Sequence, residues 1–146
     1  MSQQENIAAQ NRIAQAINDG NFDVLRQGFT PNVKEHDPAP GQKPGPEGFV
    51  DFFRAVRAAF PDFKLSADRM VADADHIALA YTMTGTHKGV FQGIAPTGKT
   101  IRARGMLIAR FENGKIAERW GSSDELGILK QLGAAVTPSS GIRKVA

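Results

Sequence analysis

The chain has 146 residues, a length that suits one domain with a buried core. Aliphatic and aromatic residues make up 41% and charged residues 23%, as is usual for a globular protein, and the absence of cysteine excludes disulfides, thiolate metal sites and a cysteine nucleophile. The net charge is +3, but the basic residues are dispersed and form no run, so we expect no nucleic-acid partner.

Neither end of the chain suggests a membrane or export signal. The first six residues contain no basic region followed by an apolar segment, so we predict no signal peptide. No apolar stretch approaches the roughly 18 residues of a membrane span. The cytoplasm is therefore the expected compartment, with no membrane partner.

The first half of the chain is predicted to be largely helical. Apolar residues at helical spacing predict a helix over 5–18, and a turn at 18–21 ends it. A short second helix is expected from Phe22, and a short strand over 33–36 after the break at Thr30-Pro31-Asn32. Residues 38–46 contain four prolines and two glycines and predict a loop.

The next helix is predicted over 46–60, as the main helix packed on the sheet. Pro46 suits a first helical turn, and Pro61 stops the helix because the residue before proline avoids the helical region. Its apolar face follows the i, i+3, i+4, i+7 pattern. That face comprises Phe49, Phe52, Phe53, Val56, Ala59 and Phe60.

After Pro61 the apolar period changes to two, which predicts strands near 63–72, 76–87, 101–111 and 116–122. Large residues such as Ile77 and Tyr81 alternate with small ones such as Ala78. The segment 112–115 predicts a hairpin turn, and 122–133 a final short helix. The tail from about 137 is expected to be flexible.

Helices followed by a run of strands predict a single α+β domain with a curved antiparallel sheet. The N-terminal helices would cover one face and leave an internal pocket, and such concave sites commonly bind ligands.

Several motifs from 85 onward resemble the SnoaL-like polyketide cyclases, or predicted ester cyclases, of the nuclear transport factor 2-like superfamily. The resemblance spans nearly the whole chain in a specific order and spacing. Its motifs are His36-Asp37-Pro38, Ala59-Phe60-Pro61-Asp62, Gly85-Thr86-His87, Gly89-Val90-Phe91-Gln92-Gly93, Pro96-Thr97-Gly98, the segment 110–120, Asp124 and Gln131-Leu132-Gly133.

This resemblance implies a cone-shaped α+β barrel that assembles as a homodimer or higher oligomer. It also implies intramolecular aldol chemistry on a polyketide-like molecule, with no metal and no organic cofactor. The acidic residue at the position of Asp124 is the family's usual acid/base. Because some relatives have other chemistry, the family indicates a scaffold more firmly than a reaction.

Asp124 is accordingly the candidate catalytic carboxylate. An aldol closure needs a base near a carbon-bound proton, and burial in an apolar pocket makes a carboxylate a stronger base. The alternative is a helix start, because Ser122 and Glu125 have the spacing of a capping box around it. Both roles are compatible.

His87 is the candidate oxyanion donor or proton carrier, since histidine exchanges protons near neutral pH. Alternatively, His87 is a structural residue whose imidazole is fixed by hydrogen bonds. The same two roles, functional and structural, are open for His36. A metal site from His36, His87 and Asp124 lacks a ligand motif and is not favoured.

The candidate pocket includes aromatic walls and charged groups. Glu118, Trp120 and Asp124 share the parity of Ile116, so a straight strand would place them on one face. Arg104 or Arg110 is expected either to point inward and hold an enolate oxygen, or to face outward. The substrate-binding candidates are His36, Phe53, Phe60, Phe91, Arg104, Met106, Glu118 and Trp120.

The sequence therefore predicts a cofactor-independent acid/base enzyme acting on a hydrophobic, oxygenated small molecule. Two alternatives stay open: a non-catalytic binding module, and a hydrolase or isomerase on the same scaffold. The small residues of one strand face, from Ala78 to Thr84, are expected to form the dimer surface.

Overall fold

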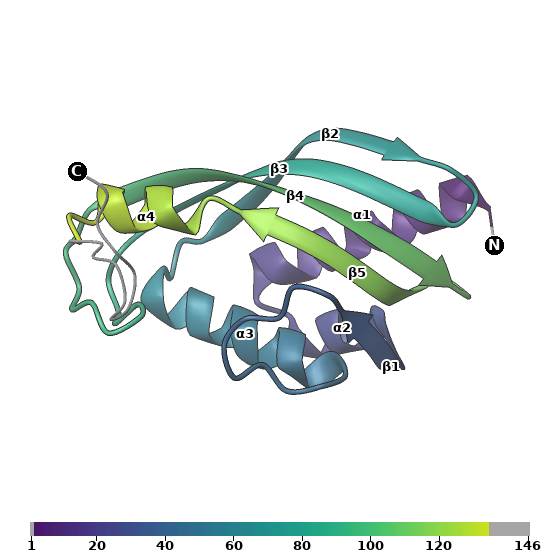
Figure 1. The fold of residues 1–146 in the computed structure, drawn as a ribbon, viewed down its shortest axis with the longest axis horizontal. Helices are drawn as coiled ribbons and strands as arrows, with labels where there is room; N and C mark the ends of the chain where they lie inside the picture. The colour runs from purple at the N-terminus through teal and green to yellow at the C-terminus, as the bar shows by residue number, and fades with distance from the viewer. Residues whose placement is uncertain (1, 135–146) are drawn as a thin grey trace, which may run out of the picture.

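The computed structural model describes residues 2–134 and has an α+β fold, in which helices cover one side of a curved five-stranded sheet (Figure 1). The predicted fold class is confirmed. The predicted flexible tail from about 137 lies outside the described residues. The elements are α1 (Gln3–Asp19), α2 (Phe22–Gln27), β1 (Phe29–Glu35), α3 (Pro46–Ala59), β2 (Lys64–Ala72), β3 (His76–Thr86), β4 (Thr100–Glu112), β5 (Lys115–Ser123) and α4 (Glu125–Gln131).

The strand order is β1-β5-β4-β3-β2. The last four strands pair antiparallel, as predicted, but β1 pairs parallel with β5, so the sheet is mixed. Residues 30–32, predicted as a break, lie inside β1. Pro31 is tolerated because β1 is an edge strand, and the register shifts between Phe29 and Lys34.

The helices begin and end where local chemistry favours it. The Ser2 hydroxyl accepts from the Glu5 N–H in a capping box, and Pro46 occupies the first turn of α3. Helix α1 packs on β2 and β3, whereas α3 packs on β1 and α2. The Phe29 and Phe49 rings stack with their centroids 4.1 Å apart. Helix α3 therefore supports the β1 edge and is not the main cover of the sheet.

A tight turn joins β4 to β5, as predicted. Asn113 and Gly114 have φ angles of 50° and 77°, the positive pair that a type I′ hairpin requires. Strand β5 continues to Ser123, so α4 begins at Glu125, three residues later than predicted. None of the helices among residues 2–134 is long and apolar enough to cross a membrane.

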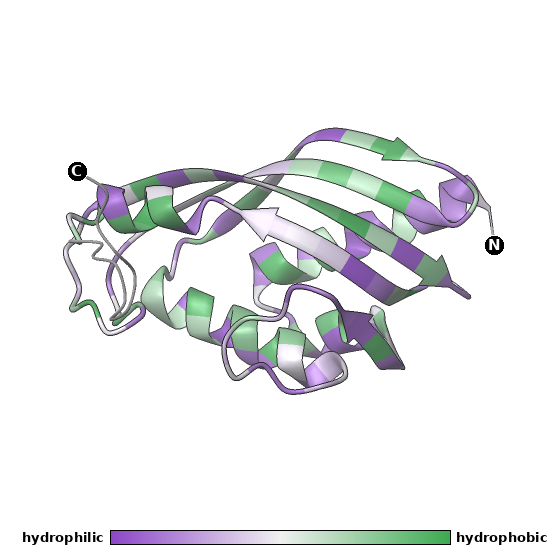
Figure 2. Cartoon of the chain, viewed as in Figure 1, coloured by the Kyte–Doolittle hydropathy of each residue, from purple (hydrophilic) through white to green (hydrophobic). Residues whose placement is uncertain are grey.

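The two faces of the sheet differ in burial. Polar and apolar residues alternate near both ends of β4, whereas its middle, from Met106 to Ala109, is apolar on both faces. Figure 2 shows the hydropathy along the strands, and the inner face packs against the helices. The alternation predicted for β3 holds from Ile77 to Tyr81, where the large residues are buried, but Thr82 is buried as well. Inner-face residues include Ile77, Leu79, Tyr81, Ile101, Ala103 and Ala109, and outer-face residues include Ala78, Ala80, Arg104, Met106 and Ile108.

A bulge in β5 changes which side chains face outward. Phe111 pairs with Ile116, but its neighbour Arg110 pairs with Glu118, so β5 contains one extra residue at Ala117. Ile116 and Ala117 are both buried. The prediction that Glu118 lies on the same face as Ile116 was wrong, because this bulge places Glu118 on the outer face.

Candidate functional site

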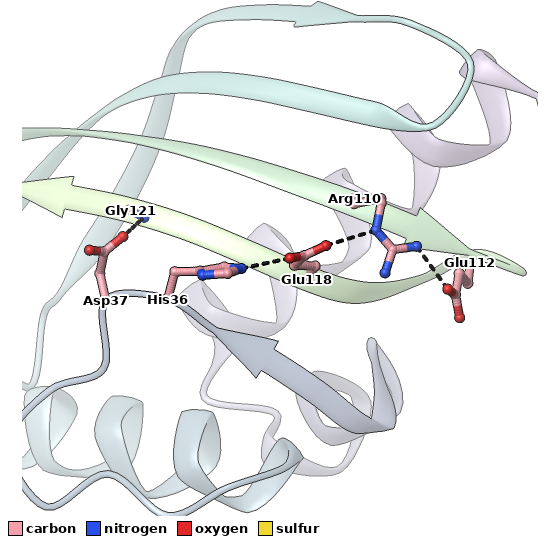
Figure 3. Close-up of polar contacts among 6 residues, drawn as sticks. All are labelled: His36, Asp37, Arg110, Glu112, Glu118 and Gly121. Atoms are coloured by element: carbon pink, nitrogen blue, oxygen red, sulfur yellow. Dashed lines mark hydrogen bonds and ion pairs between the residues drawn. The ribbon is translucent and has the colours of Figure 1, made fainter.

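Several predicted site residues lie together on the outer face, at the edge formed by β1 and β5 (Figure 3). His36 Nε2 lies 2.6 Å from Glu118 Oε2, and the His36 ring stacks on Trp120 with centroids 4.6 Å apart. Arg110 donates to Glu118 Oε1 at 3.0 Å and to Glu112 at 2.8 Å. The hydrogen bonds from His36 and then Arg110 lower the pKa of Glu118, which makes this carboxylate a weak base.

The same edge is tied together by backbone contacts. The His36 N–H donates to the Arg119 carbonyl, and the Gly121 N–H donates to Asp37 Oδ2 (Figure 3), both at 2.9 Å. The His36-Asp37 pair of the sequence motif therefore fastens the end of β1 to β5.

A shallow apolar groove of about 520 Å³ crosses the outer face beside this edge. Met106 is 63% exposed and Val71 is 61% exposed. Arg104 and Arg110 both lie on this face, so the outward-facing alternative holds for both. The groove is lined by Asp37, Arg69, Val71, Ala78, Leu79, Ala80, Met106, Leu107, Ile108, Trp120, Gly121 and Ser122.

His87 lies inside the core, where it closes the loop between β3 and β4. It is fully buried, and its Nδ1 accepts from the Thr97 N–H at 3.1 Å. Its backbone N–H donates to the Lys99 carbonyl, and the Gly98 N–H donates to its carbonyl. The buried Nε2 has no hydrogen-bond partner within residues 2–134. This arrangement matches the structural alternative for His87.

Two of the predicted aromatic walls, Phe60 and Phe91, lie near His87, on the other side of the sheet from Trp120 and the outer group. Phe60 is 2% exposed, and its ring centroid lies 5.5 Å from that of His87 and 5.2 Å from that of Phe91. Phe53 is half-buried against the core. The predicted site residues therefore form two groups and not one pocket.

Asp124 is the N-cap of α4. Its Oδ1 accepts from the Gly127 N–H at 2.8 Å, and the residue is exposed. The helix-start alternative thus describes its contacts, although Asp124 itself, and not Ser122, is the capping residue. Within residues 2–134 no group of three or more His, Cys, Asp or Glu residues could hold a metal ion.

The inner face carries a polar cluster that the sequence analysis missed, formed by Glu35, Arg119 and Tyr81. Arg119 Nη1 donates to Glu35 Oε1 at 2.8 Å, and the two side chains are 20% and 7% exposed. Burial raises the pKa of the Tyr81 phenol, whereas the nearby positive charge of Arg119 opposes that rise. Glu35 Oε2 is buried and has no hydrogen-bond partner among the described residues.

Two glycines leave room for this inner cluster. A Cβ atom at Gly105 would lie 2.4 Å from the Tyr81 hydroxyl, and one at Gly121 would lie 2.7 Å from Arg119 Nη1. A glycine within a strand often marks close approach of another group. These two residues were therefore the available sequence signal for the cluster.

Comparison with known proteins decides the family. The family model described as SnoaL-like polyketide cyclase matches residues 7–132. The chain belongs to this family. It is 28% identical over 135 residues to the aklanonic acid methyl ester cyclase AcmA of Streptomyces galilaeus, covering 88% of this chain and 91% of that protein.

Solved structures of similar proteins agree with this assignment to the SnoaL-like family. AclR of Streptomyces galilaeus, a candidate hydroxylase, is 26% identical with a TM-score of 0.80, over 90% of this chain and 98% of AclR. IdmH of Streptomyces antibioticus, a candidate polyketide cyclase, is 28% identical with a TM-score of 0.77, over 88% of this chain and 99% of IdmH. The resemblance predicted from the sequence motifs is confirmed.

Proposed function

We propose that this SnoaL-like chain is a cyclase that closes a ring in a hydrophobic, oxygenated small molecule, such as a polyketide, by an intramolecular aldol reaction. The observation that carries the proposal is the family match over residues 7–132, and the similarity to AcmA supports it. The family resemblance implies acid/base chemistry without a cofactor, and the compartment expected from the sequence is the cytoplasm.

The inner face supports this chemistry. It is mostly apolar but holds a carboxylate, a guanidinium and a phenol. Arg119 donates to Glu35 at 2.8 Å, and its charge opposes the rise in the pKa of the Tyr81 phenol. Pockets that bind small molecules combine an apolar lining with a few placed polar groups. Such a surface suits a flat substrate whose few oxygens fix its orientation.

A non-catalytic binding module is the second candidate. The contacts of the two predicted catalytic residues favour it: Asp124 caps a helix, and His87 fastens a loop. A catalyst on this scaffold would then need another acid/base group.

The cyclase proposal is tested by incubating the purified chain with aklanonic acid methyl ester, the compound in the name of AcmA. We expect a cyclised product of unchanged mass, because an intramolecular aldol closure gains and loses no atoms. Chromatography with mass spectrometry and absorbance measures it, in the presence of a chelator. A substrate recovered unchanged, but bound, would favour the binding module.

Two Asp124 variants complete this assay. Asp124→Asn retains the cap, so we expect its turnover and melting temperature to stay near those of the parent chain. Asp124→Ala removes the cap and should lower stability by about 1 kcal/mol. If instead Asp124→Asn loses roughly 10²–10⁴-fold in turnover, Asp124 is the acid/base that the resemblance implies.

We also propose a homodimer joined through the outer face. The uncovered apolar side chains of Val71, Met106 and Ile108 support this, since monomers rarely expose a large contiguous apolar patch. Thr82 of the expected surface is instead covered by Asp68, whose Oδ2 accepts from its hydroxyl at 2.6 Å. The dimer surface is therefore centred on the apolar groove.

Light scattering at micromolar concentration should report a dimer for the parent chain and a monomer for Met106→Glu. Placing a carboxylate in this apolar surface would require burying an unpaired charge on association. Exposed Glu5→Gln, on α1, is the matched control and should remain dimeric. A monomeric parent chain would reject the outer-face dimer.

A further inference from the structure

Glu35 is the most enclosed carboxylate among residues 2–134. Its side chain is 7% exposed, compared with 24% for Glu118 and 41% for Asp51, and the other acidic residues are exposed. It follows Val33 on the inner face of β1, and Val33 is also buried. A carboxylate in such a position meets little competing water.

One oxygen of Glu35 is buried and has no hydrogen-bond partner among the described residues. Oε1 accepts from Arg119, but Oε2 has no partner among the described residues. The competing carboxylates are more fully engaged: both oxygens of Glu118 have partners, and both oxygens of Asp62 accept from Thr86. Glu35 Oε2 is thus an acceptor without a hydrogen-bond partner within the described part of the chain.

Two donors belong to the same cluster as this acceptor. Arg119 uses Nη1 for Glu35 and retains further N–H groups, and Tyr81 contributes a neutral phenol, because burial raises its pKa. Arg119 is 20% exposed, whereas the Glu35 side chain and Tyr81 are 7% and 6% exposed, so solvent reaches the cluster on the Arg119 side. The Tyr81 ring packs against Gly105 and the Arg119 guanidinium against Gly121, so the two glycines fix the positions of both donors.

We propose that Glu35 is the base that removes a carbon-bound proton from an enolisable aryl ketone, with Arg119 and Tyr81 donating to the ketone oxygen. This assignment rests on the proposed cyclase function and names its acid/base group, its oxyanion donors and the class of substrate. The free carboxylate oxygen beside two donors carries it.

The step balances without a co-reactant. The proton next to the carbonyl passes to Glu35 Oε2, the C–H electron pair forms the C=C bond, and the carbonyl π pair moves onto oxygen. Arg119 and Tyr81 stabilise that enolate oxygen. The enolate carbon then attacks a second carbonyl of the same molecule, whose oxygen receives the proton from Glu35.

Deuterium exchange tests the first half of this step without requiring ring closure. 1-Tetralone, a flat aryl ketone, is incubated with the chain in D2O, and loss of its α-proton signal is followed by NMR. We expect the parent chain to exchange these protons faster than buffer. Glu35→Gln, which preserves an acceptor for Arg119, should lower the enzyme-dependent rate by roughly 10²–10⁴-fold.

Control variants separate chemistry from folding. Glu112→Gln is matched, because Glu112 also accepts from an arginine at 2.8 Å but is exposed, and its exchange rate should not change. The enzyme-dependent exchange rate of Tyr81→Phe should fall by roughly 10²–10³-fold, because the phenol that stabilises the enolate is removed. Glu35→Asp retains the carboxylate but shortens the side chain. It should therefore fold, while its enzyme-dependent exchange rate falls by about 10²-fold.

The results distinguish this assignment from the cyclase proposal. If deuterium exchange depends on Glu35 but aklanonic acid methyl ester is not cyclised, Glu35 is a base and the proposed cyclisation is wrong. Cyclisation that persists in folded Glu35→Gln rejects Glu35 and keeps the cyclase. The assignment of Glu35 is overturned if the parent chain exchanges the α-protons of 1-tetralone no faster than buffer does. It is also overturned if folded Glu35→Asp exchanges them at the parent rate.

Discussion

Phe60→Ala should lower the free energy of unfolding by about 3–5 kcal/mol. Phe60 is 2% exposed, and its ring contacts both His87 and Phe91, which belong to the segment after β3. A Cβ atom at Gly85 would lie 2.9 Å from Phe60 Cβ, so the strand already packs closely against this residue. The cavity cannot easily collapse, because strand and loop are fixed by backbone hydrogen bonds.

Urea unfolding followed by circular dichroism measures this loss. Phe52→Ala is the matched control, since Phe52 lies on α3, whose C-cap is Phe60, but is 40% exposed, and we expect a loss below about 1 kcal/mol. Helical spacing alone would rank both residues equally as core. Equal losses for the two variants would contradict the burial described for α3.

Local chemistry explains why most of the fold was predictable. Pro46 and Pro61 bound α3, and the Asn113-Gly114 turn joins β4 to β5, so each boundary depends on nearby residues only. The parallel pairing of β1 with β5 was not predictable in this way. Phe29 and Ile116 are partners separated by most of the chain, and neither segment's pattern specifies the other.

The site was less predictable because orientation depends on register. The extra residue at Ala117 shifts the parity of β5, so Glu118 turns outward and Arg119 turns inward. Hydrophobic alternation cannot reveal such a bulge when both residues beside it are buried. Gly105 and Gly121 were the visible signs of close approach, but a glycine does not identify the group that approaches.

Arg119→Met should destabilise the chain by about 3 kcal/mol, because it removes the only described partner of a buried carboxylate. The loss is expected at the lower end of the range for broken buried ion pairs, since Arg119 is 20% exposed and water reaches its position. Urea unfolding measures it. Arg110→Met on the outer face should cost much less, because Glu118 retains His36 and is more exposed.

The double variant Arg119→Met with Glu35→Gln tests whether the unpaired Glu35 side chain causes the loss of stability in Arg119→Met. Removing the carboxylate together with its partner leaves a neutral amide, so we expect the double variant to recover more than half of the stability lost by Arg119→Met alone. If the losses of the two single variants simply add, the pair is solvated and its energetic coupling is negligible. Coupling would show instead that Arg119 stabilises the Glu35 side chain on the inner face, where its second oxygen has no partner among the described residues.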